Sequence, residues 1–196
     1  MELYSIKNCA VVYTLICSIL ACAITLKAAP CWEAKVRGAA FIPTNSLFRE
    51  IYGSAAGNFD AEIAMNIGDC LQVWANFDYT GIDGNSLNFC NPTSINIFSG
   101  SFGLKAPFDT NDWSCVYLGF GPAIGGIQIK DNSQFSGCSN NTKAFVGFVA
   151  KFGVDFFFAN CWFVDFFADY TYQKVSFQKL VDASGVRIGA GIGCTF

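Results

Sequence analysis

The chain has 196 residues, which is long enough for one domain with a complete core and short for two ordinary domains. Only 14% of its residues are charged, against about 25% in an ordinary soluble domain, and 53% are hydrophobic. A formal net charge of -3 gives no electrostatic basis for binding nucleic acid, and the lack of histidine excludes Ser-His-Asp and Cys-His nucleophilic sites.

The N-terminal segment has the features of a secretory leader. Residues 9–26 form an uncharged, mostly apolar run, and the small residues Ala28 and Ala29 follow it. We therefore expect residues 1–29 to be a signal peptide and residues 30–196 to be the mature domain, with a retained N-terminal anchor as the alternative. No later stretch is long and apolar enough for a membrane-spanning helix.

The rest of the chain alternates apolar and polar side chains with a period of two, which is typical of β-strands. In the first such segment Trp32, Val36 and Ile42 have one parity, and Lys35 and Arg37 have the other. The fifth segment contains a proline, which indicates a weak strand or a bulge. The eight alternating segments are residues 32–42, 59–67, 71–79, 96–106, 116–126, 144–156, 162–172 and 186–196.

Eight such strands predict an all-β, antiparallel up-and-down barrel, either a soluble carrier of lipocalin type or a transmembrane barrel. Glycines such as Gly119, Gly153 and Gly191 share the parity of the charged residues, and small residues belong inside a narrow barrel, where space is short. A Lys or Arg that faced lipid near the midplane would cost about 2–4 kcal/mol. We therefore expect a transmembrane barrel that encloses the charges and faces lipid with aromatic side chains.

The enclosed parity carries equal numbers of cations and anions, which predicts a lumen closed by paired charges. Arg37 next to Glu62 or Asp60 is the pair that we expect first. Buried pairs of this kind often only break even in energy, so they would fix the shape of the barrel more than they stabilise it. The cations are Lys35, Arg37, Lys105, Lys143, Lys151 and Arg187, the anions are Asp60, Glu62, Asp78, Asp155, Asp165 and Asp169, and the predicted lumen network takes all of these but Lys143.

Seven cysteines follow the leader, and their positions match the strand pattern. Cys31, Cys70, Cys115 and Cys161 each precede an odd-numbered strand, and we expect them to form a ring at the inner rim with Cys194. Cys90 and Cys138 lie in the longer loops of the opposite end. These loops are expected at residues 43–57, 81–95, 131–142 and 173–184. Because seven is odd, at least one thiol must stay free, be modified or pair with another chain. Without histidine or a Cys-x-x-Cys motif a metal site is poorly supported. The candidate disulfide cysteines are Cys31, Cys70, Cys90, Cys115, Cys138 and Cys161.

The last strand alternates apolar residues and ends on Phe196, like the C-terminal signal that the barrel-assembly machinery reads. Together with the strand pattern, it makes residues 31–196 resemble the small outer-membrane barrels of the OmpA transmembrane-domain and OmpW type. The cysteine content resembles that of the envelopes of chlamydia-like bacteria. The resemblance implies a location in the bacterial outer membrane. It also implies three partners, namely outer-membrane lipid, the assembly machinery and other cysteine-rich envelope proteins.

The resulting hypothesis is a structural envelope barrel with a plugged lumen and disulfide cross-links, with no enzymatic activity and no cofactor. Asp165 and Asp169 lie about 13 Å apart along one strand, too far for a carboxylate dyad. The alternative is a narrow, porin-like channel for small apolar molecules, in the manner of OmpW-type barrels. Its pocket would be lined by the aromatic residues of the enclosed parity, Phe41, Trp74, Tyr117, Phe145, Phe163 and Phe167.

Overall fold

The computed structural model describes residues 31–68, 70–85, 92–133, 137–158, 161–176 and 180–196. The signal peptide predicted for residues 1–29 lies outside the described residues, as do Cys90 and the side chain of Cys138. Among the described residues, no helix has both the length and the hydropathy that a membrane-spanning helix needs.

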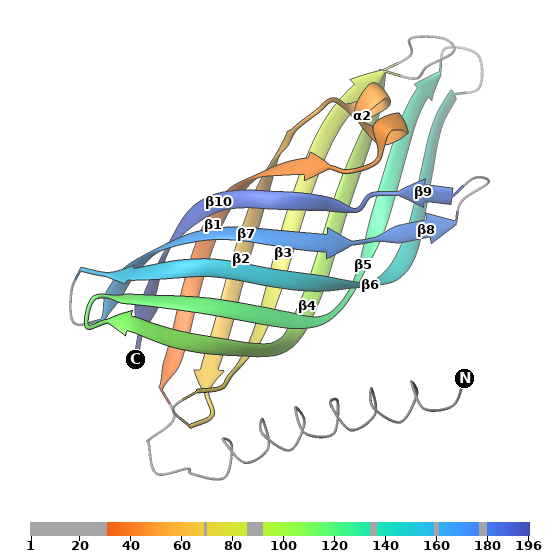
Figure 1. Cartoon of the computed structure of the whole chain (residues 1–196). Helices are drawn as coiled ribbons and strands as arrows, with labels where there is room; N and C mark the ends of the chain where they lie inside the picture. Colours follow the sequence, from red (N-terminus) through yellow and green to blue (C-terminus); the bar gives the residue numbers. More distant parts are fainter. Residues whose placement is uncertain (1–30, 69, 86–91, 134–136, 159–160, 177–179) are drawn as a thin grey trace, which may run out of the picture.

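Eight long antiparallel strands close into a barrel, as predicted (Figure 1), in the order β1-β10-β7-β6-β5-β4-β3-β2. The first and last strands close it, with Lys35 opposite Gly193 and Phe41 opposite Arg187. We call the end where β1 begins and β10 ends the inner end. The strands are β1 (Trp32–Pro43), β2 (Ala56–Asn66), β3 (Gln72–Asn85), β4 (Pro92–Asn111), β5 (Ser114–Ser133), β6 (Gly137–Phe157), β7 (Trp162–Tyr172) and β10 (Gly185–Thr195).

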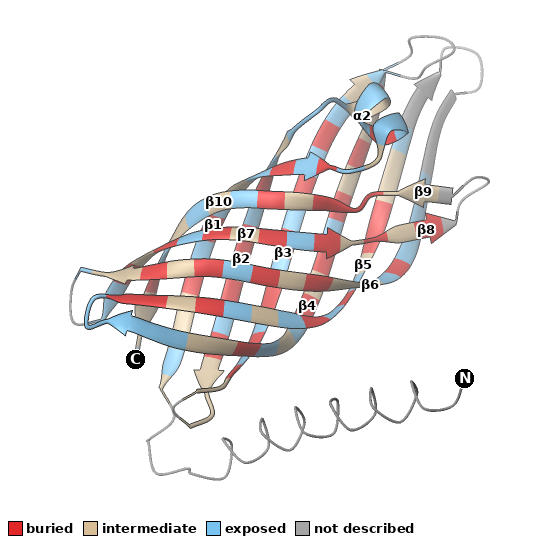
Figure 2. Cartoon of the chain, in the orientation of Figure 1, coloured by how far each residue is buried: buried red, intermediate tan, exposed pale blue. Residues whose placement is uncertain are grey.

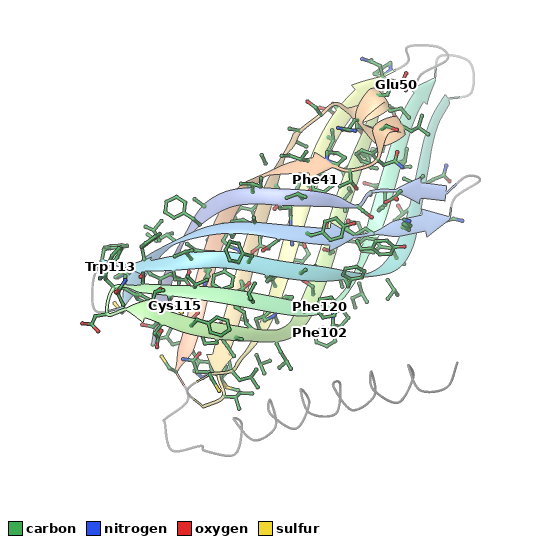
Figure 3. The ribbon with its side chains drawn as sticks, in the orientation of Figure 1. Phe41, Glu50, Phe102, Trp113, Cys115 and Phe120 are labelled. Atoms are coloured by element: carbon green, nitrogen blue, oxygen red, sulfur yellow. The ribbon has the colours of Figure 1, made fainter. Side chains whose placement is uncertain are left out.

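In the closed part of the barrel burial alternates along the wall strands (Figure 2). The buried parity there holds the charged residues of the predicted lumen network, and the exposed parity is mostly apolar. Val36 and Phe166 are about half exposed on the outer face, and Figure 3 shows Phe102 and Phe120 there as well. Inward glycines leave room for large side chains that cross the lumen. A Cβ atom at Gly153 would lie 2.4 Å from the ring of Tyr117. The predicted orientation of the two faces is therefore confirmed.

The strands differ in length, and this corrects the expected loops. β4, β5 and β6 have 20, 20 and 21 residues, whereas β1, β2, β7 and β10 have 11 or 12, close to the 9–11 that cross a bilayer. Pairing continues to Asn85 opposite Pro92 and to Ser133 opposite Gly137. Most of 81–95 and 131–142 is thus paired strand, because cross-strand pairing there overrides the turn-forming composition.

The other two outer connections also contain regular structure. The connection after β1 holds the helix α2 (Ser46–Tyr52), which Asn45 caps by accepting a hydrogen bond from the amide of Phe48 at 3.0 Å. It ends at Gly53, whose φ of 92° suits glycine. The connection between β7 and β10 holds the hairpin of β8 (Lys174–Ser176) and β9 (Leu180–Asp182). Both elements lie at the outer end of the barrel (Figure 1).

Aromatic residues form two belts on the outer face of the barrel. Trp32, Trp113 and Trp162 lie at the inner end, and all three are exposed. Tyr79 and Tyr170 lie several residues further out along their strands. The hydroxyl of Tyr79 donates to Asn96 at 2.8 Å, so the outer face turns polar from this level. Such belts mark the two interfaces of a bilayer.

Candidate functional site in the barrel lumen

Arg37 on β1 is the centre of the lumen network. One of its guanidinium nitrogens lies 2.8 Å from Asp60 and 3.2 Å from Glu62, both on the neighbouring strand β2. On β7, which β10 separates from β1, Asp165 and Asp169 each lie 3.6 Å from the guanidinium. A single cation therefore links three strands of the barrel wall.

Glu62 is a second centre, which contacts cations on β4 and on the opposite strand β6. Lys151 on β6 lies 2.7 Å from it, and Lys105 on β4 lies 2.5 Å away. Lys151 also lies 3.6 Å from Asp169. The carboxylate thus joins β2 to β4 and β6, while Arg37 joins β2 to β1.

Smaller groups of contacts lie on either side of this centre. Toward the inner end, Lys35 contacts Asp155 at 2.7 Å. Toward the outer end, one guanidinium nitrogen of Arg187 lies 3.1 Å from Asp78 and 3.8 Å from Asp60, and another lies 3.5 Å from Asp169. Together, the ionic contacts extend along most of the closed part of the barrel.

Neutral polar side chains donate hydrogen bonds to several carboxylates of the network. The Tyr117 hydroxyl donates to Asp165 at 2.8 Å, and Ser99 donates to Asp78 at 2.5 Å. Asn76 donates its amide to Asp60. Asp169 differs, because no hydrogen bond from the described residues reaches its oxygens, one of which lies 3.5–3.6 Å from three cations.

Aromatic rings cover four of the five lumen cations. The Arg37 guanidinium lies 4.3 Å from the ring centre of Phe167, and the Lys151 ammonium lies 4.4 Å from that of Trp74. Tyr117 lies between Lys35 and Lys105, with ring-centre distances of 4.6 and 4.7 Å. Contacts of this kind favour a desolvated cation. These rings therefore fill the lumen and contact its charges at the same time.

The lumen holds one cation fewer than the sequence analysis counted on the enclosed parity. Lys143 is exposed, so the described lumen holds five cations and six anions. Lys143 has the inward parity, but it lies where β6 extends past the end of β7, beyond the closed barrel. The other eleven predicted residues are all buried inside the barrel, at 5% exposure or less.

Above the ionic layer the structure has an apolar cluster that the sequence reasoning missed. Phe48 of α2, Val175 of β8 and Ala183 are buried there against strand residues. Two of the aromatic residues predicted to line a pocket belong to this cluster rather than to the ionic layer. Inward isoleucines at alternate positions were the available signal. The strand residues are Phe41, Ile82, Ile95, Ile97, Ile127 and Phe145.

The cysteines of the predicted ring all lie near the inner end, where the odd-numbered strands begin and β10 ends. Cys161 is exposed and Cys115 is buried. Among the cysteines that the structure describes, Cys31, Cys115, Cys161 and Cys194 form no disulfide. Within the described ranges no group of three or more carboxylates or thiols is arranged to hold a metal ion.

Comparison with known proteins agrees with this architecture. A family model described as "Outer membrane protein beta-barrel domain" matches residues 17–196. A search of the curated proteins found no match.

Three solved structures illustrate the shared fold. The chain is 13% identical to the outer membrane protein OprG of Pseudomonas aeruginosa, with a TM-score of 0.60 over 86% of this chain and 96% of OprG. It is 14% identical to the N-terminal β-barrel domain of OprF from the same organism, with a TM-score of 0.57 over 85% of this chain and 97% of that domain. It is 12% identical to Ail of Yersinia pestis, solved with the heparin analogue sucrose octasulfate, with a TM-score of 0.58 over 86% of this chain and 100% of Ail.

Proposed function

The chain belongs to the outer-membrane β-barrel family and lies in the bacterial outer membrane, and we propose that it serves there as a structural barrel whose lumen is closed by paired charges. The observation that carries the proposal is the set of contacts that Arg37 and Glu62 make with strands other than their own. Together they reach carboxylates or ammonium groups on β2, β4, β6 and β7. A solute in the lumen would have to displace these pairs.

The energetics of buried ion pairs support a role in shape rather than in extra stability. Taking two charges out of water costs several kcal/mol per ion, and their attraction often only offsets that cost. Charges that reach across the lumen do hold opposite walls at a defined separation. Aromatic rings occupy the space between them, with Trp74 and Tyr117 each 1% exposed.

The inner-rim cysteines are the proposed means of linking this barrel to other envelope proteins through disulfides. Cys161 is exposed, and two half-buried cysteines lie nearby, Cys31 just before β1 and Cys194 on the neighbouring strand β10. Non-reducing electrophoresis of native membranes tests the idea. We expect higher-order bands that disappear with reductant and weaken in Cys161→Ser. The same pattern of bands with and without reductant would contradict cross-linking.

Planar-bilayer recording tests the closed lumen. We expect the wild-type barrel, folded by the criterion of heat-dependent electrophoretic mobility, to show no large steady conductance. A large conductance in the wild type would overturn the proposal.

A narrow channel for small apolar molecules is the competing proposal, and the apolar residues at the outer mouth are the observation in its favour. In that case an apolar solute should raise the temperature at which the barrel unfolds. The closed barrel predicts no such shift, because Phe48 already occupies the mouth.

A further inference from the structure

We propose that the lumen is closed twice in series, and that the outer seal is an apolar cap with Phe48 of α2 at its centre. The cap is the cluster of Phe48, Val175 and Ala183 packed on the inward apolar residues of the extended strands. This inference rests on the proposed closed lumen. It adds a second seal of different chemistry, which separates the charge network from the external medium.

The two layers follow one another in the same order along several strands. On β1 the inward residues run from Lys35 and Arg37 to Phe41. On β3 they run from Asp78 through Thr80 to Ile82. On β4 they run from Lys105 through Ser101 and Ser99 to Ile97 and Ile95. On β6 they run from Asp155 and Lys151 to Phe145.

The apolar layer is a packed core rather than an open cup. Phe48 is 4% exposed, and its ring lies 4.9 Å from that of Tyr52. Ile95 and Ile127 beneath the cap have no exposed surface. The removal of such apolar side chains from water is favourable. The cluster therefore holds the cap in place without help from the charges below it.

Hydrogen bonds join the connection that holds α2 to the connection that holds the hairpin of β8 and β9. The backbone amide of Thr44 donates to the carbonyl of Ser184 at 2.9 Å, and its hydroxyl donates to the same oxygen at 3.0 Å. Ser184 also accepts from the amide of Gln173 through its hydroxyl, at 3.1 Å. The connection after β1 and the connection before β10 are thereby joined at the mouth, where these two neighbouring strands meet.

The helix also contacts the barrel wall directly through backbone. A Cβ atom built on Gly84 of β3 would lie 2.3 Å from the carbonyl oxygen of Ile51. Any side chain at Gly84 must therefore push α2 away from the wall. Gly57 on β2 is a matched position, because a Cβ atom there meets nothing within 4 Å.

Chemical accessibility of the layer just beneath the cap tests this inference. Ser99 faces inward and is 1% exposed, so Ser99→Cys places a reporter thiol under the cap. Intact cells are treated with a membrane-impermeant cationic methanethiosulfonate, and modification of residue 99 is compared with that of Asp83→Cys, an exposed position on the outer wall.

We expect slow modification of Ser99→Cys and fast modification once Phe48→Ser or Gly84→Leu is added. Leu47→Ser and Gly57→Ala should change nothing, because Leu47 is 53% exposed on the same helix and Gly57 has open space. Modification as fast as at residue 83 in the parent variant overturns the cap. So does a rate that is unchanged by both Phe48→Ser and Gly84→Leu when electrophoretic mobility shows that these barrels are folded.

Bilayer recording then shows that the seals act in series. Arg37→Ser with Glu62→Ser opens the ionic layer, and Phe48→Ser opens the cap. We expect steady conductance only when all three changes are combined. Conductance in the variant that carries only the Arg37 and Glu62 changes would overturn the second seal. Conductance in the wild type would overturn the proposed function, and the accessibility experiment would then decide whether the cap exists.

Discussion

At the scale of single residues, the lumen depends on charges that have no access to water. Glu62 contacts Arg37, Lys105 and Lys151 and is 4% exposed. Removing one member of such a group leaves its partners buried and uncompensated, which is costlier than removing both signs together. The contribution of each residue therefore depends on which partners remain.

This dependence predicts the effect of Glu62→Gln. We expect it to destabilise the barrel by about 3–5 kcal/mol, because three cations lose a buried partner. Urea unfolding in micelles, followed by electrophoretic mobility, measures the change. Glu50→Gln removes the same charge from an exposed position on α2 and should have little effect. Equal unfolding midpoints for the two variants would show that the network contributes nothing to stability.

At the scale of elements, α2 is too short to be stable without its cap and its packing. It has seven residues, and isolated helices of that length are marginal in water. The side chain of Asn45 and the burial of Phe48 are what hold it. The hairpin of β8 and β9 is shorter still, and the two residues after it, Ala183 and Ser184, form hydrogen bonds with Gln173 and Thr44.

The N-terminal cap of α2 gives a second prediction. Asn45→Ala should weaken the helix by about 1 kcal/mol, since the Phe48 amide loses its acceptor. Faster hydrogen exchange of α2 amides, with unchanged exchange in β1, is the expected result. Asn45→Asp keeps an acceptor and should exchange like the wild type. Unchanged exchange in Asn45→Ala would mean that packing alone holds α2.

The outer hairpin gives a prediction about pH. Partial burial alone would raise the pKa of Asp182, but hydrogen bonds from Ser184 and the nearby Lys174 ammonium outweigh it and hold the pKa below its ordinary value. The resulting stabilisation is therefore present above the ordinary carboxyl pKa and is lost as the pH falls through the lowered one. We expect the Ser184 amide to become less protected from exchange in that acidic range. Asp182→Asn should remove this pH dependence, and a wild-type amide with pH-independent protection would contradict it.

At the scale of the whole molecule, the aromatic belts and the strand lengths define how the barrel sits in the bilayer. Three tryptophans lie on the outer face at the inner end, and Trp74 is enclosed. Beyond the Tyr79 level the extended strands carry polar residues such as Asn96 and Gln128 on their outer face. That part of the barrel therefore projects out of the membrane, with the cap inside it.

Tryptophan fluorescence in brominated lipids checks this placement. A protein that keeps Trp113 alone should be quenched strongly by bromine close to the headgroups and weakly by bromine at the chain ends. A protein that keeps Trp74 alone should be quenched by neither, because its ring lies inside the wall. Strong quenching of Trp74 would mean that the two faces have been assigned the wrong way round.

The sequence by itself determined the wall of this barrel. A period of two is a local property of an extended chain, so alternation at Val36, Arg37 and their neighbours was enough to separate the lipid face from the lumen. The same alternation predicted an inward position for eleven charged residues that are buried in the structure. It could not show that Lys143 lies past the end of β7, because strand ends depend on the partner strand.

Only the tertiary structure decided which side chains meet inside. Contact between Arg37 on β1 and Asp165 on β7 depends on the register and closure of all eight strands, and no local pattern encodes either. The cap depended on closure as well. The inward isoleucines at 82, 95, 97 and 127 need a closed mouth before Phe48 and Val175 can cover them, and burial across the mouth is a property of the assembled barrel rather than of any segment.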